Sequence, residues 1–83
     1  MSASLFSRHD HNQKPTKRIC FRLKEIRKES GLTQDALAQR VGVTRQTIIA
    51  IEQGKFVPSV KLALLLSNEF GKPLEDLFWI ENQ

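Results

Sequence analysis

The sequence contains little of what disulfide-bonded, zinc-binding or membrane-spanning proteins require. Its single cysteine, Cys20, excludes an internal disulfide and cannot by itself form a zinc site. No apolar run approaches the roughly 20 residues of a membrane span, and the first residues lack the apolar core of a signal peptide. We therefore expect a cytoplasmic protein. Its 83 residues predict one small domain with a modest hydrophobic core.

Enzymatic chemistry also lacks support in the sequence. No nucleophile stands beside a general base, and no group of residues has the spacing of metal ligands. His9 and His11 lie one residue apart in a polar stretch, which is a poor geometry for binding a metal. No stretch remains for a domain that senses a small molecule. We expect no enzymatic activity, no metal and no cofactor.

Positive charge is concentrated near the N-terminus. The formal net charge is +4, and residues 1–32 hold eight Lys and Arg against three acidic residues. Residues 33–58 carry +1 and residues 59–83 carry −2. This gradient suits either a surface that faces a polyanion or an ordinary soluble surface. Residues 1–16 show no apolar periodicity, so we expect a flexible basic tail, able to lie along DNA, ahead of a domain at 17–83.

The stretch from residue 33 to residue 53 predicts two short helices joined by a tight turn. Each helix opens with a threonine that can cap it and continues with apolar residues at helical spacing. These residues are Thr33, Leu37 and Val41 in the first helix, and Thr44, Ile48 and Ile51 in the second. Gly42 suits the positive φ with which helices commonly end, and Ala38 allows close packing. The pattern is typical of a helix-turn-helix whose outer face carries Arg45, Gln46 and Thr47.

The flanking segments predict a helical domain with a minor sheet. The expected elements are strands at 17–21 and 78–80 and helices at 21–30, 60–70 and 73–77. The two strands would pair antiparallel, either within one chain or across two. We therefore expect an all-α, compact five-helix domain with one short two-stranded element.

Two features suggest contact with a second subunit. Leu65 falls within the polar stripe of the nearly apolar helix at 60–70. Phe78, Trp79 and Ile80 are too bulky to remain in water at a chain end. A lone exposed leucine is also normal in soluble proteins. We expect a homodimer interface that includes these four residues.

Arg27 and Glu52 each flank an apolar helix stripe, at i+4 from Leu23 and Ile48 respectively. They are either two exposed charges of little energetic value or a partly buried pair that joins the first helix to the third. The second alternative predicts a large loss of stability when Glu52 is removed, because a buried cation is left unpaired.

The run from Leu32 to Asp76 resembles the Cro/repressor-type helix-turn-helix family of small prokaryotic regulators, also called the xenobiotic-response-element class. The resemblance is carried by Gly31-Leu32-Thr33-Gln34, Leu37-Ala38, Val41-Gly42-Val43, Thr44-Arg45-Gln46-Thr47-Ile48, Ile51-Glu52, Gly54-Lys55, Pro58-Ser59 and Leu74-Glu75-Asp76-Leu77-Phe78. It covers somewhat over half of the chain. In similar members, short terminal strands help to form a homodimer.

The resemblance implies a role for each matching position. Three positions stand where the recognition helix reads base edges: Arg45, Gln46 and Ala50. Five others stand where phosphate or mixed contacts are expected: Thr33, Gln34, Thr44, Thr47 and Lys55. Ala50 offers only a methyl group, which leaves few polar reading groups in each half-site. Arg27 and Glu52 match the family's interhelical ion pair.

The expected function is therefore sequence-specific binding of double-stranded DNA by a transcriptional regulator, a repressor that acts as a homodimer. Its recognition helix at 45–53 would enter the major groove. Two alternatives remain open. An antitoxin that represses its own operon would also bind a toxin, through residues 78–80 or the N-terminal tail. A protein-interaction module that has kept the helix-turn-helix shape would bind no DNA.

Overall fold

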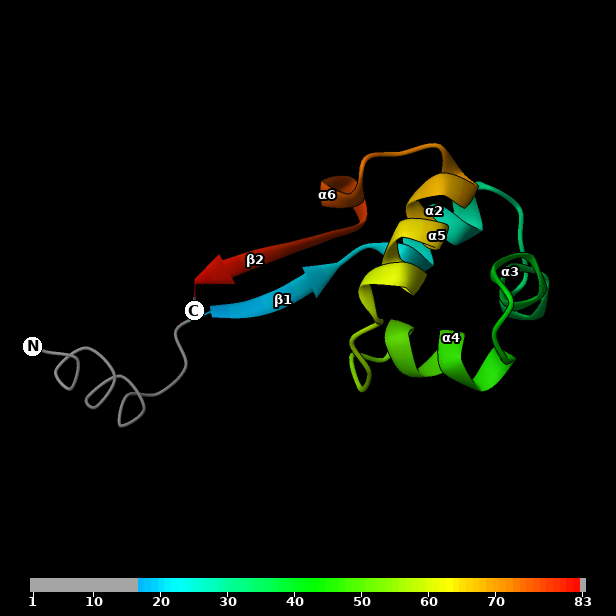
Figure 1. The fold of residues 1–83 in the computed structure, drawn as a ribbon, viewed down its shortest axis with the longest axis horizontal. Helices are drawn as coiled ribbons and strands as arrows, with labels where there is room; N and C mark the ends of the chain where they lie inside the picture. Colours follow the sequence, from blue (N-terminus) through cyan, green and yellow to red (C-terminus); the bar gives the residue numbers. More distant parts are fainter. Residues whose placement is uncertain (1–16, 83) are drawn as a thin grey trace, which may run out of the picture.

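The computed structural model describes residues 17–82, which form five helices and two strands (Figure 1). In chain order these are β1 (Lys17–Phe21), α2 (Leu23–Glu29), α3 (Gln34–Val41), α4 (Arg45–Glu52), α5 (Val60–Phe70), α6 (Leu74–Leu77) and β2 (Phe78–Asn82). The predicted all-α class with a short two-stranded element is confirmed. The tail expected at 1–16, with His9 and His11, lies outside the described residues. Within residues 17–82 no helix has both the length and the apolar composition to cross a bilayer.

Helices α3 and α4 form the predicted helix-turn-helix. The hydroxyl oxygen of Thr33 accepts a hydrogen bond from the Ala36 N–H at 3.0 Å, and that of Thr44 accepts one from the Thr47 N–H at 3.3 Å. These caps satisfy backbone donors that a helix start leaves unpaired. Gly42 ends α3 with a φ of 78°, a left-handed conformation that turns the chain towards the start of α4.

Helix α5 lies among the other helices and supplies much of the core (Figure 1). The Ser59 hydroxyl oxygen accepts a hydrogen bond from the Leu62 N–H at 3.1 Å, and Gly71 ends the helix, both as predicted. The buried core consists of Leu23, Ile26, Leu37, Ala38, Val41, Ile48, Ile51, Leu62, Ala63, Leu66, Leu77 and Phe78. Because α4 turns Ile48 and Ile51 into this core, its opposite side is held towards solvent.

Strands β1 and β2 pair antiparallel within one chain, which answers the question that the sequence left open. The register runs from Lys17 opposite Asn82 to Phe21 opposite Phe78. The rings of Phe21 and Phe78 lie 6.4 Å apart, where the two-stranded ribbon formed by β1 and β2 meets the helices. Figure 1 shows the remainder of the ribbon pointing away from the helical body.

Two predicted helix boundaries were wrong by a few residues. The first helix begins at Leu23 and not at residue 21, because Phe21 belongs to β1 and the Arg22 N–H donates to the Leu77 carbonyl at 3.0 Å. The last helix begins at Leu74, since Pro73 has the extended ψ of 149° and stands before the first helical residue.

Arg27 on α2 and Glu52 on α4 form a buried ion pair. Arg27 Nε donates to Glu52 Oε2 at 2.7 Å, and Arg27 Nη2 donates to Glu52 Oε1 at 3.2 Å. The two side chains are only 8% and 4% exposed. The structure therefore shows the buried alternative for these two charges.

Two further groups complete this network. Arg27 Nη1 donates to the Leu32 carbonyl at 2.8 Å, and the side-chain amide of Gln34 donates to Glu52 Oε1 at 3.0 Å. The network thus joins α2, the loop after it, the start of α3 and the end of α4. Both charges are well provided with hydrogen bonds, which is the condition for burying an ion pair without a large penalty.

Removing one partner of this pair should destabilise the fold strongly. We expect Glu52→Ala to lower the free energy of unfolding by about 3–5 kcal/mol, because Arg27 would remain buried without its counter-charge. The matched control is Glu69→Ala, which breaks the Arg40–Glu69 pair at 2.8 Å, whose side chains are 56% and 22% exposed. That loss should stay below about 1 kcal/mol. Equal losses in urea denaturation of the two variants would contradict the assignment.

Candidate nucleic-acid interface

The outer side of α4 carries polar residues at helical spacing. Gln46, Ala50 and Gln53 follow one another at i, i+4 and i+7, opposite the buried Ile48 and Ile51. Gln46 and Gln53 are exposed, and Ala50 is half-buried. The side chain of a glutamine can present a donor and an acceptor together. The stripe is therefore able to recognise a partner that offers paired hydrogen-bonding groups.

Arg45 stands exposed at the first position of α4, beside this stripe. Within residues 17–82, the structure gives neither Arg45 nor Gln46 a side-chain hydrogen bond or ion pair. Both groups keep their full bonding capacity for an external partner. A planar guanidinium and an amide are the side chains best suited to bidentate contacts.

The two threonines at the start of α4 are already partly engaged. Thr44 uses its hydroxyl oxygen as the helix cap, and its hydroxyl lies 3.2 Å from that of Thr47. Thr47 is half-buried, whereas Thr44 is exposed. Any contact that these residues make with an anion would therefore use the remaining hydroxyl capacity and the backbone N–H groups of the helix start.

The side chain of Gln34, a residue for which the sequence suggested a phosphate contact, is engaged within the protein. Its side-chain amide donates to Glu52, and the residue is half-buried. Gln34 thus braces the ion pair, while Thr33 stands exposed as the cap of α3. Sequence reasoning missed this bracing role, because it depends on how closely α3 and α4 approach each other.

A shallow recess of about 370 Å³ lies next to the polar stripe. It is lined by Gln46, Thr47, Ala50, Lys55 and Phe56. The sequence indicated Lys55 but neither Phe56 nor Gln53. The spacing of seven residues from Gln46 could have identified Gln53, whereas nothing in the sequence indicates that Phe56 stays outside the core.

The charges of the helical body are unevenly distributed around α4. Arg45 and Lys55 are exposed at its two ends. The carboxylates of Glu75 and Asp76 belong to α6, which lies on the far side of the helical body from α4 (Figure 1). An anion that approaches α4 therefore meets the exposed charges of Arg45 and Lys55, whereas the carboxylates of α6 lie on the other side of the helical body.

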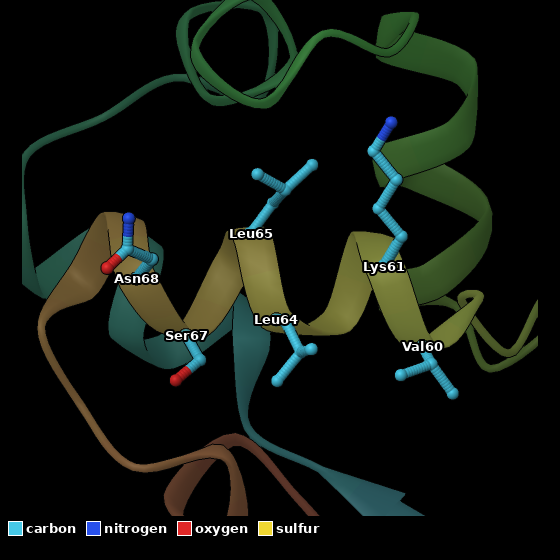
Figure 2. A pocket seen from close by; sticks show the side chains of 6 residues that line it. All are labelled: Val60, Lys61, Leu64, Leu65, Ser67 and Asn68. Carbon is cyan, nitrogen blue, oxygen red and sulfur yellow. The ribbon is translucent and has the colours of Figure 1, made fainter.

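The outer surface of α5 is a second exposed feature. It carries a hollow of about 720 Å³ lined by Val60, Lys61, Leu64, Leu65, Ser67 and Asn68 (Figure 2). Leu65, Lys61 and Asn68 point to one side of the helix in that view, and the other three point to the opposite side. Val60 is 76% exposed, Leu64 52% and Leu65 38%. The sequence pointed to Leu65 alone, because a nearly apolar helix gives no period that shows which side faces solvent.

The expected interface residues of β2 are divided between core and surface. Phe78 is only 8% exposed and packs in the core, so it reaches the surface only as part of the lining of a hollow. Trp79 is half-buried and Ile80 is 60% exposed. A second hollow of about 260 Å³ includes Ile80, Val57 and Val60, so it continues the apolar surface of α5 towards the ribbon.

Titratable groups on the ribbon show no reactive site. Partial desolvation, a hydrogen bond with Glu81 and the charge of Glu81 raise the pKa of the Cys20 thiol. A hydrogen bond from the Trp79 indole N–H at 2.9 Å, followed by one from Cys20, lowers the pKa of Glu81. Cys20 is therefore protonated at neutral pH. The described part of the chain also holds no group of three or more residues suited to a metal ion.

Comparison with known proteins defines the class to which this site belongs. The helix-turn-helix family model matches residues 23–77, which includes every helix of the structure. The chain belongs to this helix-turn-helix family. Its members named below are transcriptional regulators, and the chain is accordingly a DNA-binding regulator and not an enzyme.

Several regulators from bacteria and archaea are similar to this chain over most of their length. YgzD of Bacillus subtilis, an uncharacterized HTH-type transcriptional regulator, is 47% identical over 62 residues, which cover 75% of this chain and 94% of YgzD. A regulator of Methanothermobacter thermautotrophicus is 52% identical over 71% of this chain and 87% of its own. The regulator MJ0272 of Methanocaldococcus jannaschii is 51% identical over 74% and 92%.

Proposed function

We propose that the protein is a homodimeric, sequence-specific repressor that places α4 in the major groove of double-stranded DNA. The observation that carries this proposal is the outer stripe of α4. It presents polar groups without partners inside the described chain, on a helix whose other side is fixed by the core and by the Arg27–Glu52 pair. Helices of this kind read base edges with residues near their N-terminal end.

Arg45, Gln46 and Ala50 are the proposed base-reading residues. The guanidinium of Arg45 suits the O6 and N7 atoms of guanine, and the amide of Gln46 suits the N6 and N7 atoms of adenine. Ala50 contributes no hydrogen bond. Gln53, which follows Ala50 on the same stripe, is a fourth candidate because it is exposed at the end of α4.

The remaining contacts are proposed to hold the phosphate backbone. Thr33 stands at the start of α3, and Thr44 and Thr47 at the start of α4, where backbone N–H groups favour an anion. Gln34 would approach a phosphate through its backbone N–H, because its side chain is engaged with Glu52. Lys55 adds a positive charge just after α4. Such contacts supply affinity without distinguishing sequences.

Two copies are needed because one copy makes few contacts. Dimers of such proteins bind half-sites about one helical turn, roughly 34 Å, apart. The apolar residues Val60, Leu64 and Ile80, with Leu65 on the other side of the same hollow, are the proposed interface, since apolar groups gathered at two neighbouring exposed hollows are typical of a contact surface. Trp79 lies at its edge. Occupying a promoter in this way represses transcription without any further domain.

Selection of binding sites from random duplex DNA tests the function as a whole. We expect enrichment of an inverted repeat with half-sites about one turn apart. A protein-interaction module would give no enrichment, and no binding even at low salt. The proposal is also wrong if the double variant Arg45→Ala, Gln46→Ala binds DNA as tightly as the unaltered chain.

Two single variants separate backbone contacts from base contacts. Lys55→Ala should weaken binding to all sequences alike, because one phosphate contact is lost. The slope of log affinity against log salt concentration should become shallower by about 1. Gln46→Ala should relax the choice at one base pair, at a cost of about 1–3 kcal/mol for the preferred base. Affinities measured across salt concentrations and across single-base operator variants distinguish the two. The reverse pattern would overturn the assignment of roles.

The dimer surface is tested by placing a charge within it. Leu64→Glu, at a side chain that is 52% exposed, should leave the monomer folded and convert the dimer to monomers in sedimentation equilibrium. The affinity for an operator with two half-sites should fall as the dimer is lost. Lys72→Glu, in the exposed loop after α5, is the control and should remain dimeric. A Leu64→Glu protein that stays dimeric would place the interface elsewhere.

A further inference from the structure

The recess beside the polar stripe is lined by both apolar and polar residues. Ala50, Thr47 and Phe56 each carry an apolar group, a methyl, a γ-methyl and an aromatic ring, and Gln46 and Lys55 carry an amide and an ammonium group. Phe56 is 45% exposed and does not belong to the core cluster. Its place at the recess puts an exposed aromatic ring next to the surface that is proposed to meet DNA.

Phe56 is held in place by the backbone of the turn after α4. The Lys55 N–H donates to the Ala50 carbonyl at 2.9 Å, and the Gly54 N–H donates to the Ile51 carbonyl at 3.0 Å. Gly54 has a φ of 77°, which reverses the chain direction directly after the helix. These bonds tie the residue before Phe56 to the last turn of α4, so the backbone brings Phe56 to the recess that Ala50 also lines.

The chemistry of the major groove leaves one apolar group that such a recess can accept. Base pairs present donors and acceptors on their major-groove edges, and in addition thymine presents its C5-methyl group. Alanine, the threonine methyl and phenylalanine are the apolar groups that contact this methyl. The amide of Gln46, one helical turn before Ala50, would meanwhile reach a neighbouring base edge.

We propose that Thr47, Ala50 and Phe56 form a pocket for the C5-methyl group of a thymine in each half-site. This inference rests on the proposed function and names one base that it recognises. It also gives Ala50 a role, because its methyl group is an apolar contact of the kind that a thymine methyl accepts. Phe56, which lies outside the helix-turn-helix, becomes a residue that determines specificity.

Replacing thymine by uracil tests the pocket, because the two bases differ only in this methyl group. The probes are duplexes of the sequence selected from random DNA, with one thymine at a time replaced by deoxyuridine in both half-sites. We expect replacement of one particular thymine in each half-site to lower the affinity, by about fourfold for each methyl group removed. This is the ratio that burial of one methylene-sized group produces. Fluorescence anisotropy measures both affinities.

Two variants assign the effect to the recess. Phe56→Ala, at an exposed position that should leave the fold intact, is expected to bind thymine and uracil duplexes equally. Lys72→Ala, in the exposed loop after α5, does not line the recess and should keep the full preference for thymine. The thymine pocket is contradicted if Phe56→Ala still prefers thymine to uracil duplexes. It is also contradicted if the unaltered protein binds the selected duplex but does not distinguish thymine from uracil. In both cases the proposed function is unaffected. Absence of binding to any duplex at low salt would overturn both.

Discussion

The buried pair of Arg27 and Glu52 is the interaction on which the arrangement of the helices depends. It joins α2 to the end of α4, and its two further hydrogen bonds reach Leu32 and Gln34 at the start of the helix-turn-helix. Apolar packing alone is non-directional and would permit α4 to rotate or slide. A bidentate ion pair fixes one geometry. The outer stripe of α4 is therefore presented at a defined angle.

The reading surface proposed on α4 is small, and its size limits what one copy can recognise. Arg45 and Gln46 supply the polar groups near the start of α4, and Ala50 supplies none. We infer that discrimination is completed by the recess at Phe56 and that affinity comes from phosphate contacts and from a second subunit. The exposed apolar side chains of α5 are unfavourable in water when the protein is a monomer, and their burial would stabilise such a dimer.

The sequence predicted the local structure, the pairing of the two strands and the Arg27–Glu52 contact, but not the other contacts between elements. Caps such as Thr33 and the stop at Gly42 act within a few residues, so their effect is visible in the chain itself. The bracing role of Gln34 depends on the distance between two helices. The exposure of Leu64 was hidden because α5 is apolar on nearly every side, and the position of Phe56 depends on the turn before it.

The central claim is that α4 is the surface that meets DNA, and an NMR titration tests it most directly. The ¹⁵N-labelled chain would be titrated with the duplex selected from random sequences, and backbone amide shifts would be followed residue by residue. The account predicts that the largest changes lie at residues 44–56 and at the start of α3, with small changes across β2. Changes concentrated on α5 and the ribbon, with α4 unaffected, would contradict it.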